Sequence, residues 1–123
     1  LYLTGYTPYP PRQEIEKVAL GATEAVPWEY IKDPMEAVKR IKEQGIKIVP
    51  LEITQNSRSY TEIETDEFPL CLILGNELTG VSNDIIELSD FSIEIPQYGF
   101  KHSINVSVAY GVAVMELVRK LQV

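Results

Sequence analysis

Apolar positions follow two different periods along this chain, and the pattern predicts strands that alternate with helices. Short β-branched or continuous apolar runs are typical of strands, and apolar residues three or four positions apart are typical of helices. The predicted strands cover residues 1–5, 46–52, 70–74 and 91–95. The run at 70–74 has no polar alternation, so we expect a strand buried on both faces. Strands separated by helices predict an α/β fold with a mainly parallel sheet and flanking helices.

The clearest local signal predicts a helix from Pro34 to just before Gly45. Asp33 is a good N-cap, proline suits the first helical position, and Glu36 completes a capping box. Gly45 is typical of the left-handed residue that ends a helix. Met35, Val38 and Ile41 form the apolar stripe.

The remaining segments carry weaker signals. Residues 12–22 predict a short helical turn ended by Gly21, and residues 25–30 predict an edge strand, because Pro27 cannot donate to a central ladder. Residues 54–67 are polar and acidic and predict no regular element. Residues 82–88 predict a short helix with Ser82 as its cap.

The final predicted helix, residues 103–121, is apolar nearly all round, so we expect it to be buried. The small polar side chains of Ser103, Asn105 and Ser107 stand at its start, where buried polar groups need partners. Taken alone, Ser103 is explained most simply as the N-cap of this helix. The presence of three small polar side chains together suggests a functional site. Ser107 and Gly111, one turn apart, allow close packing, either within the chain or against a second subunit.

Ligands of open parallel sheets bind outside the carboxyl ends of the strands. Those ends carry Thr4 and Gly5, Leu51 and Glu52, residues 75–77, and residues 95–96. The glycine-framed turn at 75–80 is not a phosphate-binding P-loop, because Val81 occupies the position that requires lysine. No dinucleotide fingerprint is present either. The turn lets the backbone approach a ligand, or it simply connects a strand to a helix.

Composition excludes several function classes. The 123 residues are 45% hydrophobic and 24% charged, which is typical of one globular domain. No apolar run is long enough to cross a membrane, and no signal peptide is visible. One cysteine and one histidine cannot build a Cys/His zinc site within one chain. The lone Cys71, expected to be a buried and inert thiol, suits a reducing cytoplasm.

Charge argues against non-specific binding to nucleic acid. The formal net charge is −7, and residues 61–123 carry ten acidic side chains against three basic ones. Such binding relies on basic patches. The charge balance does not exclude a local RNA contact.

Two long motifs, residues 72–82 and 95–109, together resemble the second and third motifs of the SpoU (TrmH) family of RNA ribose methyltransferases, in the SPOUT superfamily. Residues 17–22 and 49–52 are also similar to family segments. The resemblance implies that residues 1–123 form a single SpoU-type methyltransferase domain. It further implies the SPOUT α/β-knot fold, in which the C-terminal part is threaded as a trefoil knot.

The resemblance also implies S-adenosylmethionine as cofactor. By position, its adenosine pocket would use Leu74 and Gly75 from the second motif and Ile95 and Ile104 from the third. The other strand ends supply secondary candidates, namely Thr4, Gly5, Leu51 and Glu52. The reaction would move a methyl group to a ribose 2′-hydroxyl of tRNA or rRNA, without a metal, and the family works as a homodimer in the cytoplasm.

Glu77, Ser103 and Asn105 match conserved family positions near the reacting centre, although Asn105 suits an architectural role better than that of a base. The family's first motif, an Asn…Arg segment ahead of the first strand, is absent from these residues. We therefore expect the domain to be truncated at its N-terminus. The alternative function is a non-catalytic module that binds S-adenosylmethionine or RNA without this arginine.

Overall fold

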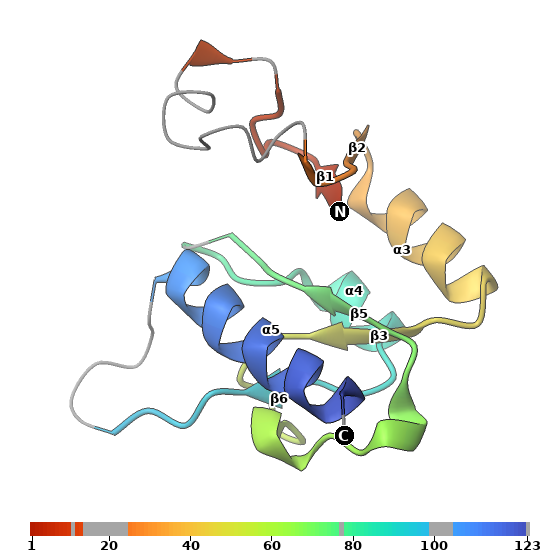
Figure 1. Ribbon diagram of the computed structural model, residues 1–123. Coiled ribbons are helices and arrows are strands. Elements are labelled where there is room, and N and C mark those ends of the chain that lie inside the picture. Colours follow the sequence, from red (N-terminus) through yellow and green to blue (C-terminus); the bar gives the residue numbers. More distant parts are fainter. Residues whose placement is uncertain (11, 14–24, 77, 99–104, 123) are drawn as a thin grey trace. The chain divides into compact units, whose positions relative to one another are not determined.

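A computed structural model describes residues 1–10, 12–13, 25–76, 78–98 and 105–122. The chain divides into two compact units, Leu1–Arg40 and Ile41–Val123, and each is described by itself. Both are built from parallel strand pairs and helices, which confirms the predicted α/β class (Figure 1).

The described part of the first unit contains one strand pair. Strand β1 (Tyr2–Thr4) runs parallel to β2 (Glu29–Ile31), with Tyr2 opposite Glu29. The predicted edge strand at 25–30 thus begins later, beyond Pro27, where every residue can donate an N–H. The Tyr30 ring stacks on Tyr9 with centroids 4.2 Å apart, and the Tyr30 hydroxyl donates to the Gly5 carbonyl. The helical turn predicted at 12–22 lies almost entirely outside the described residues.

Helix α3 (Pro34–Glu43) begins and ends as its local signals predict. The Asp33 carboxylate accepts the Met35 N–H at 3.0 Å, and Gly45 has φ +80°. The Glu36 carboxylate, predicted to complete a capping box, lies 3.3 Å from Arg40 Nη2 one turn later. This exposed ion pair spans the i,i+4 spacing that brings side chains together on a helix.

The second unit is organised around β3 (Lys47–Pro50). It pairs in parallel with β5 (Leu70–Ile73), with Lys47 opposite Leu70. On its other side a parallel bridge joins Leu51 to Ile93, the first residue of β6 (Ile93–Glu94). Strand β4 (Arg58–Ser59) pairs with β6, so the strands follow one another in the order β5, β3, β6, β4.

Helices α4 (Asn83–Leu88) and α5 (Val106–Leu121) complete the described part of this unit. Two 3₁₀ turns, η1 (Tyr60–Glu62) and η2 (Thr65–Glu67), follow β4. A core cluster of Val49, Ile63, Ile93 and Leu117 joins strands, loop and α5. Helix α5 contributes Ala109, Ala113 and Leu117 as its buried residues.

Several sequence-based expectations need correction. The strand predicted at 91–95 shortens to Ile93–Glu94, and residues 54–67 contain β4, η1 and η2. Strand β5 is half-buried at every position, because among the described residues of its unit it has a neighbouring strand on one side only. Ser82 occupies the N-cap position of α4, but its side chain makes no capping hydrogen bond.

Helix α5 differs most from expectation. It begins at Val106, and its N-cap is Asn105, not Ser103. It is also not buried all round: Val108, Tyr110, Val112, Met115, Val118 and Leu121 are exposed. A Cβ added to Gly111 would meet nothing within 4 Å, so this glycine serves no close packing among the described residues. The buried stripe of α5 consists of Ala109, Ala113 and Leu117. The opposite face of the helix is apolar but exposed.

An ion pair between β4 and η2 predicts acid sensitivity. Arg58 Nη2 lies 2.6 Å from Glu67 Oε2, and its guanidinium carbon lies 3.9 Å from the Phe91 ring centroid. The hydrogen bond from Arg58 lowers the pKa of Glu67 below its ordinary 4.5. A lowered folded-state pKa stabilises the fold above the ordinary pKa, and this stabilisation is lost as the pH falls through the lowered value. We expect a contribution of about 1 kcal/mol, because the pair is partly exposed.

Urea unfolding of wild type and Glu67→Gln between pH 7 and pH 3 measures this contribution. The variant is expected to lose about 1 kcal/mol at pH 7 and to differ less from wild type as the pH falls. The exposed Glu62→Gln variant is the matched control. Equal stability of Glu67→Gln and wild type at pH 7 would contradict a stabilising ion pair.

Candidate functional site

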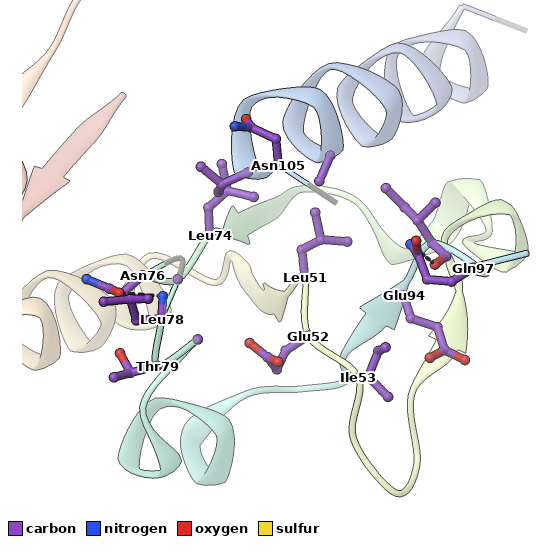
Figure 2. Close-up of a pocket in the computed structure, with 15 residues that line it drawn as sticks. Leu51, Glu52, Ile53, Leu74, Asn76, Leu78, Thr79, Glu94, Gln97 and Asn105 are labelled. Atoms are coloured by element: carbon purple, nitrogen blue, oxygen red, sulfur yellow. Dashed lines mark hydrogen bonds between the residues drawn. The ribbon is translucent and has the colours of Figure 1, made fainter. Parts of the chain in front are cut away.

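A pocket of about 650 Å³ opens where β3, β5 and β6 end and α5 begins (Figure 2). Its volume lies within the range of small-molecule sites, and its position is the one at which parallel sheets bind ligands. All of the described lining residues belong to the second unit. They are Leu51, Glu52, Ile53, Leu74, Gly75, Asn76, Leu78, Thr79, Gly80, Glu94, Ile95, Gln97, Asn105, Val106 and Ala109.

The turn after β5 forms one wall of this pocket and is closed by its own hydrogen bonds. The Asn76 N–H donates to the Gly80 carbonyl at 3.2 Å, and the Gly80 N–H donates to the Asn76 carbonyl at 2.7 Å. The Asn76 side-chain oxygen accepts the Leu78 N–H at 2.7 Å. Gly80 has φ +71°, a conformation that side chains disfavour.

Gly75 is required by close packing of the backbone. A Cβ at this position would lie 2.2 Å from the Gly80 carbonyl carbon and 2.4 Å from the Val81 nitrogen. No real Cβ contact is this short, so the two ends of the turn can meet only if residue 75 is glycine. The glycine therefore serves packing of the turn against itself, and the approach of this backbone to a ligand stays a prediction.

Glu52 reaches the same turn from the end of β3. Its Oε2 accepts the Val81 N–H at 3.0 Å, and Figure 2 shows the carboxylate directed toward the segment of Thr79. The Glu52 N–H donates to the Ile93 carbonyl at 3.0 Å, which fixes the backbone that carries the side chain. Glu52 thus connects three segments that border the pocket.

Asn105 borders the pocket from the start of α5. Its Oδ1 accepts the Ser107 N–H at 2.8 Å and the Ser107 hydroxyl, so this oxygen is occupied as a helix cap. The amide nitrogen of Asn105 can donate to a ligand, but an amide is no general base. The architectural alternative predicted for Asn105 fits these contacts.

The opposite wall follows β6. The Gln97 side-chain nitrogen donates to the Ile95 carbonyl at 2.9 Å, which folds this side chain back over the strand end. Glu94 also lines this wall. Among the described lining residues the charged side chains are Glu52 and Glu94, so this part of the pocket is acidic.

The structure brings most of the described candidate residues together. Leu51, Glu52, Leu74, Gly75, Ile95 and Asn105 all line the pocket. Glu77, Ser103 and Ile104 lie outside the described residues, and Thr4 and Gly5 belong to the first unit. The pocket therefore tests the position of the first six residues only, and the roles of all eleven candidates stay predictions.

Other pocket residues were not singled out from the sequence, among them Ile53, Thr79, Glu94, Val106 and Ala109. Ala109 follows Asn105 by one helical turn, so knowledge of where α5 begins would have indicated it. Glu94 lies in β6, where side chains alternate between the two faces of the strand. This strand has too few residues for the sequence to show which face borders the pocket.

Three further findings concern cofactors and membranes. In the described part of the chain, no group of three or more His, Cys, Asp or Glu side chains is arranged to hold a metal ion. Burial raises the pKa of the Cys71 thiol, which makes it a poor nucleophile. None of the described helices has the length and apolar character needed to cross a bilayer.

Comparison with known proteins gives a consistent result. The family model described as the SpoU rRNA Methylase family matches residues 1–115. The tRNA (guanosine(18)-2′-O)-methyltransferase of Aquifex aeolicus (strain VF5) is 35% identical over 105 residues, which are 85% of this chain and 49% of that protein. The Escherichia coli (strain K12) enzyme of the same name is 30% identical over 115 residues, 91% of this chain and 50% of that protein. The chain spans about half the length of these curated relatives.

Solved structures agree with this comparison. The A. aeolicus TrmH/SpoU tRNA modifying enzyme matches with a TM-score of 0.84 and 32% identity, over 99% of this chain and 62% of that one. An AdoMet bound rRNA methyltransferase from Sinorhizobium meliloti matches with a TM-score of 0.87 and 26% identity, over 98% of this chain and 45% of that one.

Proposed function

The chain belongs to the SpoU rRNA methylase family, and from this premise we propose that it transfers a methyl group from S-adenosylmethionine to a ribose 2′-hydroxyl of tRNA or rRNA. The observation that carries the proposal is the pocket at the strand ends, which lies between the two family-like motifs. The names of the similar proteins support it, because they are RNA 2′-O-methyltransferases and an AdoMet-bound rRNA enzyme.

The pocket residues fit this donor. Leu51, Leu74 and Ile95 offer apolar contact to an adenine ring, and the backbone at Gly75 carries no side chain that would block it. We propose that these residues, with Ile104, bind the adenosine. The candidacy of Thr4 and Gly5, which belong to the first unit, stays a prediction from the sequence.

When bound, the donor supplies a methyl group on a sulfonium sulfur, which keeps the electron pair of the broken bond and leaves as a neutral thioether. The protein must align the ribose oxygen with that methyl group and accept the hydroxyl proton. We propose that Glu77, Ser103 and Asn105 lie near the reacting ribose hydroxyl and carry out these tasks. Asn105 holds the first turn of α5 in place and can donate its amide N–H groups, whereas a carboxylate such as Glu77 can accept a proton.

We further propose a homodimer and a knotted C-terminal part. The exposed apolar side chains of α5, among them Val108, Val112 and Met115, form a surface suited to a second copy. The trefoil knot expected for the family would be formed by the C-terminal part of the domain. Residues 1–123 would then make one methyltransferase domain that acts in the cytoplasm.

The proposal is tested with methyl-labelled S-adenosylmethionine and unmodified tRNA and rRNA. Ribose 2′-O-methylation blocks alkaline cleavage of the adjacent phosphodiester, so label is expected in alkali-resistant dinucleotides. Titration calorimetry with S-adenosylhomocysteine is run in parallel. Binding without transfer of the label would indicate the non-catalytic module. If the protein neither binds S-adenosylhomocysteine nor transfers the label, both functions are overturned.

A further inference from the structure

Glu52 makes a contact that joins the turn of residues 75–80 to a different strand. The other hydrogen bonds of this turn described above, between Asn76 and Gly80 and between Asn76 and Leu78, close the turn on itself. The bond from the Val81 N–H to Glu52 Oε2, at 3.0 Å, fixes the turn against the end of β3. Residues 52 and 81 are far apart in sequence, so this contact sets how the two walls of the pocket face each other.

The fit between Glu52 and the turn is close. A Cβ at Gly80 would lie 2.5 Å from Glu52 Oε2 and 3.1 Å from the carboxylate carbon. Val81 is buried, and a buried N–H without an acceptor costs free energy. The absence of a side chain at residue 80 and the carboxylate at residue 52 therefore complement each other.

We propose that Glu52 is a positioning residue of the methyl-donor pocket. Its carboxylate accepts the Val81 N–H and so holds the turn in the conformation in which Leu74 and Gly75 line the pocket. This role differs from direct donor binding, which its place at a strand end suggested. The inference rests on the proposed function, since the ligand whose binding depends on the turn is the methyl donor.

A competing role for Glu52 is electrostatic. A carboxylate in an acidic pocket attracts the positive sulfonium of S-adenosylmethionine, and this attraction is weaker for S-adenosylhomocysteine, whose sulfur is neutral. Positioning does not depend on the charge of the ligand. The two roles therefore differ in their effect on these two molecules.

The test measures dissociation constants of both molecules by titration calorimetry for wild type, Glu52→Ala and Glu52→Gln. Positioning predicts that Glu52→Ala weakens binding of both molecules by about tenfold, the effect of losing one hydrogen bond to a charged group. Glu52→Gln keeps an acceptor oxygen of the same reach and is expected to stay within about threefold of wild type. The exposed Glu87→Gln variant on α4 is the control for net charge.

A second measurement follows the contact itself. The amide proton of Val81 is expected to shift upfield and to exchange faster with solvent in Glu52→Ala, and to keep its shift in Glu87→Gln. The thermal unfolding of each variant shows whether it is folded at the binding temperature.

Each outcome decides the inference. It is overturned if Glu52→Gln binds as weakly as Glu52→Ala, if the loss is confined to the sulfonium compound, or if Glu52→Ala binds as wild type does. If wild-type protein binds neither molecule, the proposed function fails first and the inference fails with it. An unchanged Val81 amide in Glu52→Ala would refute the contact independently of any ligand.

Discussion

Replacing Gly75 with alanine is expected to weaken binding of S-adenosylhomocysteine by about 100-fold, or about 2.7 kcal/mol. The added Cβ would overlap the backbone of Gly80 and Val81, at 2.2 and 2.4 Å. Backbone cannot rotate out of the way as a flexible side chain can, so the turn must open. Opening it separates the ends of the turn and displaces the pocket wall. Titration calorimetry measures the loss.

The matched control is Gly45→Ala, at the end of α3. Gly45 has φ +80°, but a Cβ there meets nothing within 4 Å. This variant is expected to lose about 1–2 kcal/mol of unfolding free energy through backbone strain and to bind the ligand as wild type does. If Gly75→Ala also bound as wild type does, the turn after β5 would not form a wall of the donor site.

Replacing Met115 with glutamate is expected to convert the proposed homodimer into monomers, raising its dissociation constant at least about 100-fold. Met115 is 69% exposed and lies within the apolar face of α5. A carboxylate there remains hydrated in the monomer but would lose its water in an interface formed by that face. Light scattering coupled to gel filtration measures the mass across a concentration series.

Stability of the monomer separates this effect from misfolding. Because Met115 is exposed, its substitution is expected to change the unfolding free energy of the monomer by less than about 0.5 kcal/mol. Val26→Glu places the same charge on an exposed apolar residue of the first unit. A Met115→Glu protein that keeps the wild-type mass would show that α5 is not the interface.

The elements that the sequence predicted well are those with local causes. Helix α3 carries its start and stop signals within its own segment, from Asp33 to Gly45, so no distant contact is needed to place it. The pocket was indicated by a rule of topology: once strands are parallel, their carboxyl ends meet at one edge. This explains why Leu51, Leu74 and Ile95, distant in sequence, were expected to lie together.

The features that the sequence did not reveal depend on tertiary contacts. Strand β4 consists of two residues that are extended because Arg58 pairs with Ile93 and its side chain bonds Glu67. Ser103 and Asn105 are both good N-caps by residue type, so only the position of the first helical turn chooses between them. Nor could composition show which apolar face of α5 stays exposed, because both faces carry aliphatic residues. The bond between Glu52 and Val81 links side chain and backbone across 29 positions and leaves no pattern in either segment.

The central position of β3 in the sheet also has a consequence for folding of the protein during its synthesis on the ribosome. Ile48 and Val49 have no exposed surface in the finished fold, yet β5 and Ile93, which flank β3, are synthesised later. A nascent chain that ends before Ile93 leaves this apolar strand with an unpaired edge, which invites pairing with other chains. Parallel pairing across such separations is also slow. The yield of folded protein should therefore depend on protection of β3 during translation, as well as on the stability of the completed sheet.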